Sequence, residues 1–245
     1  MKAKKFNALL ISAMACTALL ATSCKDEEEK EPGSSPVSTI TASVGDIDVD
    51  TVKVLVWFEE EGNMVVLQSA PYANGGFSMT LPGSVDAKYL ESMFEEGRMM
   101  SLNISNRSVK AAWADIYGYN SEVGGGSFYY EKRVGQGEEE EVVVYADLVY
   151  VDGDVVVTGT EARREEEGDR TYSWTTTYSV SLKKGWNFLY ETGTEEVSPD
   201  GKTKTYTSSY TTSNPGGLKW YYQPKGYYGA PKAAASAFKP FKVKR

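Results

Sequence analysis

The stretch Thr171–Leu182, TYSWTTTYSVSL, alternates large apolar side chains with serine and threonine. Tyrosine, tryptophan, valine and leucine fall on one face of an extended chain, interrupted only by Thr176, and hydroxyl side chains fall on the other. Successive side chains of a strand point to opposite faces, so this pattern predicts a strand with one buried and one solvated side. Antiparallel sheets commonly contain such half-buried strands. The stretch therefore indicates an all-β protein.

Similar segments, separated by turn signals, recur along the chain. Asp152-Gly153 stands between two valine-rich runs, which is a strong signal for a two-residue hairpin. The segments Thr171–Trp186 and Thr205–Trp220 resemble each other, since each runs from Thr-Tyr through a Ser/Thr-rich strand and a turn to a tryptophan. Two copies are too few for a solenoid. We expect these segments to form successive hairpins of one meander.

Residues 84–96 have the pattern of a helix. Ser84 is a suitable N-cap, apolar side chains recur at helical spacing, and Gly97 stands at the stop position. About a dozen short strands with this one short helix predict an all-β fold, either an antiparallel β-sandwich or a barrel-like meander. We expect the β domain to span residues 37–245. Gly124-Gly125-Gly126 leaves open a division into subdomains 37–122 and 123–245.

The first residues of the chain have the layout of an export signal. Lys2, Lys4 and Lys5 form a positive segment, and an uncharged, mostly apolar run over residues 8–21 is too short to span a membrane as a helix. Small residues precede Cys24. We therefore expect residues 1–23 to be a signal peptide. Residues 24–36, acidic and then rich in Pro, Gly and Ser, suit an extended tether.

Two features of this segment resemble known export motifs. A cysteine after small residues is similar to the lipobox of bacterial lipoproteins, which implies a diacylglycerol on Cys24. The run Lys25-Asp26-Glu27-Glu28-Glu29 resembles the export tag of surface-exposed lipoproteins of the Bacteroidota. Leu182-Lys183-Lys184-Gly185-Trp186-Asn187 also resembles a phrase in uncharacterised lipoproteins of that group. The resemblance implies anchoring to the outer membrane, facing the cell exterior, with a periplasmic orientation as the alternative.

Composition excludes several classes of function. The chain has no histidine and two cysteines, both in the first 24 residues, so Ser-His-Asp and Cys-His catalysis and zinc sites of imidazole or thiolate are excluded from the β domain. Loss of the three leader lysines takes the net charge from −8 to −11. An acidic surface argues against nucleic-acid binding. We expect no metal, no cofactor and no catalytic residue.

Carboxylates are the acid–base groups that remain. Asp46, Asp48 and Asp50 alternate as calcium ligands do, but Thr51 and Trp57 stand where an EF-hand needs glycine and glutamate, which favours a solvated strand face. A glycan hydrolase would need two paired carboxylates. The candidates are scattered in sequence and include Glu59, Asp115, Asp147, Asp152 and Glu191.

Paired tyrosines provide the best candidates for a contact surface. Adjacent residues of a strand point to opposite faces, so one tyrosine of each pair can face outward, where aromatic rings suit sugar stacking and protein interfaces. The alternative is that such rings are core residues and ordinary cross-strand partners. The pairs are Tyr117 and Tyr119, Tyr129 and Tyr130, Tyr221 and Tyr222, and Tyr227 and Tyr228. The predicted binding residues are Trp220, Tyr221, Tyr222, Tyr227 and Tyr228.

Three functions are compatible with these features. The first is a lipid-anchored, non-enzymatic module that binds a glycan, a peptide or an envelope protein, with the membrane as a partner through Cys24. The second is a barrel that carries a small apolar ligand against Tyr172, Trp174, Trp186 and Phe188. The third is a carboxylate-based glycan hydrolase. We favour the first, because aromatic pairs are abundant and histidine and thiol catalysts are excluded.

Overall fold

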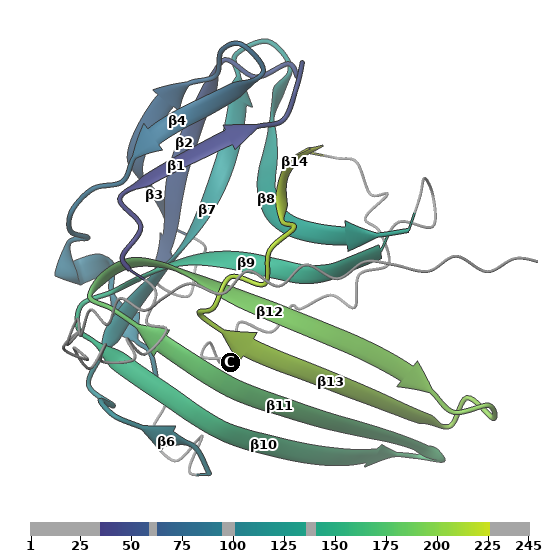
Figure 1. Ribbon diagram of the computed structural model, residues 1–245. Coiled ribbons are helices and arrows are strands. Elements are labelled where there is room, and N and C mark those ends of the chain that lie inside the picture. Colours follow the sequence, from purple (N-terminus) through teal and green to yellow (C-terminus); the bar gives the residue numbers. More distant parts are fainter. Residues whose placement is uncertain (1–34, 59–62, 95–100, 136–140, 226–245) are drawn as a thin grey trace, which may run out of the picture. The chain divides into compact units, whose positions relative to one another are not determined.

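The computed structural model describes residues 35–58, 63–94, 101–135 and 141–225. These residues are almost entirely strands (Figure 1), which confirms the all-β prediction. The strands are β1 (Thr39–Ser43), β2 (Thr51–Phe58), β3 (Asn63–Pro71), β4 (Gly76–Thr80), β5 (Glu91–Ser92), β6 (Asn103–Ile104), β7 (Lys110–Asn120), β8 (Gly124–Val134), β9 (Glu141–Val151), β10 (Val155–Glu167), β11 (Arg170–Leu182), β12 (Gly185–Val197), β13 (Thr203–Thr211) and β14 (Lys219–Pro224). In these ranges, no helix combines the length and the apolar character that a membrane span requires.

The strands form two sheets. β1 and β4 pair as a small two-stranded sheet. The other strands form a 12-stranded sheet in the order β3-β2-β7-β8-β9-β12-β13-β11-β10-β6, with β14 added on β8 and β5 added on β7. The order begins at β3 and ends at β6, so the described strands do not close into a barrel. β7 and β8, on either side of residue 122, are neighbours in this sheet.

The expectation that the two similar segments form successive hairpins is wrong for β11 and β13. β13 lies between β12 and β11, antiparallel to β12 and parallel to β11. In this register Trp174 is opposite Tyr206 and Tyr178 is opposite Tyr210. The strands β11 and β13 of the two similar segments are thus side by side in one sheet, where two aromatic pairs form and most hydroxyl residues meet hydroxyl residues. Cross-strand pairs of these kinds stabilise a sheet.

The helix predicted over residues 84–96 is reduced to one 3₁₀ turn of three residues, η1 (Ala87–Tyr89). Asp86 caps this turn by accepting a hydrogen bond from the Lys88 amide. The chain then forms the short strand β5 on the edge of β7. The apolar side chains that suggested a helix separate into two places, since Val85 joins one hydrophobic core and Met93 joins another. Residues 95 and 96 lie outside the described ranges.

Two hydrophobic cores lie on opposite faces of β7 and β9. The first core packs the small sheet against the large one, for example Phe77 of β4 against Phe128 of β8. The second core gathers side chains of β9 to β13 around Trp113 of β7. Alternate residues of β9 enter different cores, with Leu148 in the first and Val149 in the second. These two strands therefore tie both cores into one sheet.

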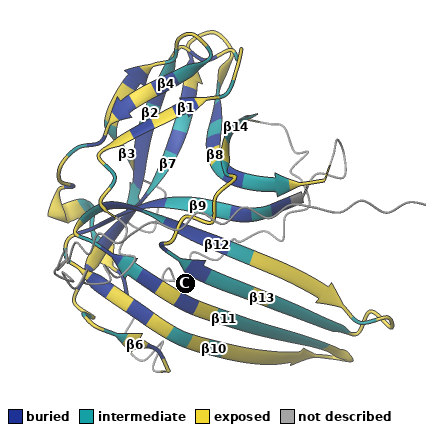
Figure 2. Cartoon of the chain, viewed as in Figure 1, coloured by how far each residue is buried: buried dark blue, intermediate teal, exposed yellow. Residues whose placement is uncertain are grey.

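The outer halves of β10 to β13 extend beyond the second core. Figure 2 shows exposed residues along the ends of β10 and β12, and Glu165–Glu167 are all exposed. One face of this part carries Tyr172, Trp174 and Tyr206, whose rings stack nearly parallel with interplanar angles of 18° and 10°. The Arg163 guanidinium covers the Trp174 ring at 5.5 Å. The faces of Trp174 therefore contact neighbouring side chains.

Candidate functional site

The neighbouring strands β7, β8 and β9 of the large sheet separate at one point, which we call the fork. β7 pairs with β8 over residues 116–120 and with β9 over residues 111–114. β8 and β9 pair with each other beyond this point. The residues between the paired stretches are Asp115 of β7, Tyr129 of β8 and Asp147 of β9. At these residues the three strands are not paired with one another, so the sheet is interrupted here.

A cavity of about 190 Å³ lies at the fork and is lined by residues of all three strands. At ~30 Å³ per water molecule it has room for about six waters. Pockets for drug-sized ligands start at roughly 300 Å³. The fork cavity therefore suits one small chemical group, such as a side-chain terminus or one ring of a larger ligand.

The lining has an acidic side and an aromatic side. Alternation along the strands places Asp115, Tyr129 and Asp147 on the face of the second core, together with Tyr145. The opposite face, which belongs to the first core, carries aromatic rings. Among the residues that the structure describes, the charged residues of the lining are these two aspartates, and none is a lysine or an arginine.

The acidic side is held by neighbouring strands. Trp57 of β2 donates its Nε1–H to Asp115 Oδ2, which orients that carboxylate. Asp147 lies close enough to Tyr210 of β13 for its charge to affect that tyrosine. Burial is the largest cause that raises the pKa of Tyr210, and the charges of Glu191 and Asp147 raise it further. These contacts place the acidic side of the lining beside β2 and β13.

A row of glutamate and tyrosine side chains crosses the same face beside the cavity. The register places Glu131, Tyr145, Glu191, Tyr210 and Tyr178 opposite one another on β8, β9, β12, β13 and β11. Four of them are at least 95% buried, Tyr145 being half-buried. Burial also raises the pKa of Tyr178, helped by its hydrogen bond to Glu161. The row therefore places two buried glutamates and two tyrosines with raised pKa values beside the cavity.

Glu131 belongs to this row and was not among the residues predicted from the sequence. It is 3% exposed and forms an ion pair with Arg133, two residues further along β8. The Arg133 guanidinium in turn lies 3.9 Å from the centre of the Tyr221 ring. The signal available in the sequence was the run Glu131-Lys132-Arg133, an acid inside a tyrosine-rich strand. The positive charge of Arg133 is thereby engaged by Glu131 and Tyr221, outside the cavity lining.

The aromatic side is fixed by the first core. Tyr130 lies between Trp220 and Phe188, with ring centroids 4.8 Å and 5.4 Å away. Trp220 also meets Phe77 of the small sheet edge-on at 6.0 Å. These contacts pack the aromatic side of the cavity against the first core.

The predicted contact loop divides between the two faces of β14. Trp220 and Tyr222 pack against the first core, where Tyr222 lies 5.0 Å from Phe128. Tyr221 is on the opposite face with Arg133. Of these residues, Trp220 lines the fork cavity. Tyr227 and Tyr228 lie outside the described residues.

Other predicted sites separate in the structure. Cys24 and the Lys25–Glu29 run lie outside the described residues, as does Glu59. Asp152 accepts a hydrogen bond from the Lys110 amide in the turn after β9, and Asp48 accepts one from Asn120. No group of three or more metal-ligating side chains gathers among the residues that the structure describes.

The four residues proposed to hold an apolar ligand lie in three different environments. Tyr172 and Trp174 are on the outer half of β11. Trp186 is buried in the first core and donates its Nε1–H to the carbonyl of Pro82 at 2.9 Å. Phe188 lines the fork cavity.

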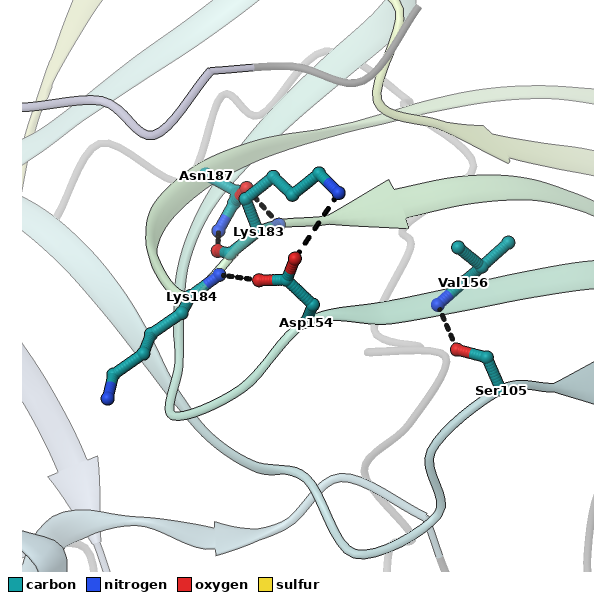
Figure 3. Close-up of polar contacts among 6 residues, drawn as sticks. All are labelled: Ser105, Asp154, Val156, Lys183, Lys184 and Asn187. Carbon is teal, nitrogen blue, oxygen red and sulfur yellow. Dashed lines mark hydrogen bonds and ion pairs between the residues drawn. The ribbon is translucent and has the colours of Figure 1, made fainter. Parts of the chain in front are cut away.

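The segment Leu182–Asn187 forms the turn between β11 and β12 (Figure 3). Asn187 is fully buried, accepts a hydrogen bond from the Lys183 amide at 3.0 Å and donates to the carbonyls of Lys183 and Gly185. Asp154 accepts hydrogen bonds from the Lys184 amide and from the Lys183 side chain. These bonds lower the pKa of Asp154. The side chains of Asn187 and Asp154 thus close this turn, which gives the segment a structural role.

The glycines at residues 124–126 belong to β8 and permit close strand packing. A Cβ atom on Gly126 would lie 2.1 Å from the carbonyl oxygen of Gln223 on β14. A side chain there is therefore incompatible with the pairing of β14 and β8, which positions Trp220 at the cavity. In the sequence these glycines suggested a subdomain boundary, and no local pattern predicted the fork.

Comparison of the chain with protein-family models, with curated proteins and with solved structures found no match. The function of this chain must therefore be inferred from its own residues.

Proposed function

We propose that the protein is a lipid-anchored envelope protein, displayed on the cell surface, that binds a glycan, a peptide or a partner protein without chemical turnover. The observation that supports binding is the fork cavity, whose aromatic wall is held by core contacts and whose opposite side carries two carboxylates. Rigid concave sites with a few placed polar groups are typical binding sites. The first residues of the chain support the anchor.

The experiment for binding uses the full-length protein, purified in detergent, and follows tryptophan fluorescence during heating. A ligand of the folded state raises stability by RT ln(1 + [L]/Kd), about 2.7 kcal/mol at a hundredfold excess over Kd. We expect at least one class among glycans, peptides and small amines to raise the melting temperature. The increase should disappear in Trp220→Ala, and Trp174→Ala, which changes the outer half of β11, should retain it. A ligand that binds both variants equally would exclude the fork cavity.

The experiment for anchoring changes Cys24. In Cys24→Ala, which lacks the thiol that would carry the diacylglycerol, the protein should leave the membrane fraction. Protease treatment of intact cells should digest the wild-type protein. Full protection would reverse the proposed orientation and favour the periplasmic face.

A second function is favoured by one observation, the presence of Asp115 and Asp147 in the same cavity. Paired carboxylates are the machinery of glycan hydrolysis. A carboxylate hydrolase would turn over at least one glycoside in a broad panel and lose that activity in Asp115→Asn or Asp147→Asn. Inactivity across the panel would leave the binding function.

A further inference from the structure

We infer that the fork cavity binds one uncharged aromatic ring, carried either by an aromatic side chain of a peptide or by a free small molecule. This inference rests on the proposed binding function and names the ligand class of the same site. Its first support is the face of the sheet on which the cavity lies. The lining residues outside β7, β8 and β9 are Phe188 of β12 and Trp220 of β14. Both rings pack against the first core, so the cavity lies on the face that carries this core.

The carboxylates of the lining point to the other face. Asp115, Tyr129 and Asp147 stand where the pairing of β7, β8 and β9 stops, and strand alternation turns their side chains toward the second core. A ring on the face of the first core therefore contacts the main chain of these residues rather than their carboxylates.

The second support is the chemistry of the side chains that line the cavity on the face of the first core. Ala114 and Ala146 leave space between larger neighbours. The other side chains on this face are Ile116, Phe128, Tyr130, Leu148, Phe188 and Trp220. Within this set, the Tyr130 hydroxyl and the Trp220 N–H are the groups that can form hydrogen bonds. A sugar ring would lose the hydration of several hydroxyl groups without enough side-chain partners, whereas an aromatic ring needs none.

The third support is size. The cavity has a volume of about 190 Å³. Apolar cavities of roughly 150 Å³ bind benzene, so one ring fits and a second ring does not. Ala114, Ala146 and Phe188 are half-buried rather than sealed from solvent. A ring can therefore enter while the rest of its molecule stays outside.

The neighbouring aromatic rings favour a further ring. Tyr130 has Trp220 at 4.8 Å and Phe188 at 5.4 Å between ring centroids. These separations are within the range of about 4.5–7 Å in which aromatic pairs attract each other. A ring bound in the cavity would extend this cluster, which a saturated ring of the same size would do less well.

The test measures the affinity of the full-length protein in detergent for N-acetylphenylalanine amide by calorimetric titration. N-acetylalanine amide lacks the ring and should bind at least about tenfold more weakly, because burial of a phenyl group is lost. N-acetylcyclohexylalanine amide has a saturated ring and should bind about threefold more weakly or worse, because contacts between aromatic rings are lost. Benzyl alcohol presents the ring without a peptide unit. Binding as tight as that of the phenylalanine amide would identify a free small molecule as a sufficient source, and weaker binding would identify a peptide.

Variants locate the site. Ala146→Leu fills the cavity from β9 and Ala114→Leu fills it from β7, so each should lower the affinity for N-acetylphenylalanine amide at least about tenfold. Ala162→Leu is the matched control, since it adds the same side chain at an exposed position of β10 and should leave the affinity unchanged. Detergent micelles take up the probe equally in every sample, so the difference between variants reports the cavity. Circular dichroism verifies that each variant is folded, and the second cavity-filling position serves if one variant does not fold.

Three results would overturn the inference. They are equal affinity for the phenylalanine and alanine amides, equal affinity for the phenyl and cyclohexyl probes, and unchanged affinity in the folded cavity-filling variants. Stabilisation by a glycan that disappears in Trp220→Ala, with no binding of an aromatic probe, would reject the aromatic class and retain the binding function. No response to any ligand class would reject both.

Discussion

At the scale of single residues, buried polar side chains stabilise particular turns and particular rows of cross-strand neighbours. Asn187 and Glu191 are two of the buried polar side chains among the described residues. Each has a defined role, Asn187 in the turn between β11 and β12 and Glu191 beside Tyr210. Buried polar groups are costly unless hydrogen-bonded. These two positions should tolerate substitution poorly.

Asn187→Ala should lower the free energy of unfolding by about 1–3 kcal/mol, because the backbone groups of Lys183 and Gly185 lose their partner in a buried turn. Urea unfolding followed by circular dichroism measures this change. Asn103→Ala removes an exposed amide on β6 and should change stability by less than ~0.5 kcal/mol. Equal effects of the two substitutions would show that the Asn187 hydrogen bonds contribute no net stability.

At the scale of elements, rows of side chains across β8 to β13 link distant parts of the chain. Three buried tyrosines, one on each of β11, β12 and β13, have pKa values that are shifted in the same direction. Burial raises the pKa of Tyr190 to about 12, and Tyr178 and Tyr210 are raised as well. A folded-state pKa above the unfolded value of ~10 means that the folded protein holds the proton more tightly. This stabilisation is complete below pH ~10 and is lost as the pH rises above it.

We therefore predict that the free energy of unfolding falls from about pH 10 upwards, with a slope of up to ~1.4 kcal/mol per pH unit for each shifted tyrosine. Tyr210→Phe should make this slope shallower. Denaturant titrations between pH 8 and about 12 give both slopes, and an identical pH dependence in Tyr210→Phe would contradict the explanation.

Gly126→Ala tests the pairing of β14 with β8. The new Cβ would meet the Gln223 carbonyl and the Pro224 backbone, so β14 must move away from β8. We expect the β14 amides to lose protection from hydrogen exchange and the unfolding free energy to fall by about 1–3 kcal/mol. Gly193→Ala is the control, because its Cβ would make ordinary contacts at 3.6 Å and 3.7 Å. Retained protection of β14 in Gly126→Ala would show that the strand is not held in this register.

At the scale of the whole molecule, the two cores share β7 and β9. Neighbouring residues such as Leu148 and Val149 enter different cores, so one core cannot lose its strands without disturbing the other. The expected consequence is cooperative unfolding. The alternative of two subdomains, 37–122 and 123–245, predicts separate transitions.

Substitutions in the two cores distinguish these outcomes. Phe77→Leu weakens the first core and Leu182→Ala weakens the second, where such truncations cost about 1–5 kcal/mol. With cooperative unfolding, each variant lowers one common transition in tryptophan fluorescence and in circular dichroism. A transition that splits in either variant would favour two subdomains.

The sequence by itself determined the all-β class, the position of most strands and the absence of histidine and thiol chemistry from the β domain. Alternation such as that of Thr171–Leu182 is a local property, because each side chain's face depends on its neighbours in the chain. The helix prediction failed for a related reason. Residues 84–96 have helical spacing, but Val85 and Met93 are buried in different cores, so tertiary contacts override the local pattern.

Only the tertiary structure decided the candidate site. Asp115, Tyr129 and Asp147 come from three strands and meet where β7 leaves β8 for β9, and Trp220 reaches them through β14. The parallel pairing of β11 and β13 was decided in the same way. The register between strands that are distant in sequence depends on how both faces of the sheet pack. The sequence of a single segment does not contain that information.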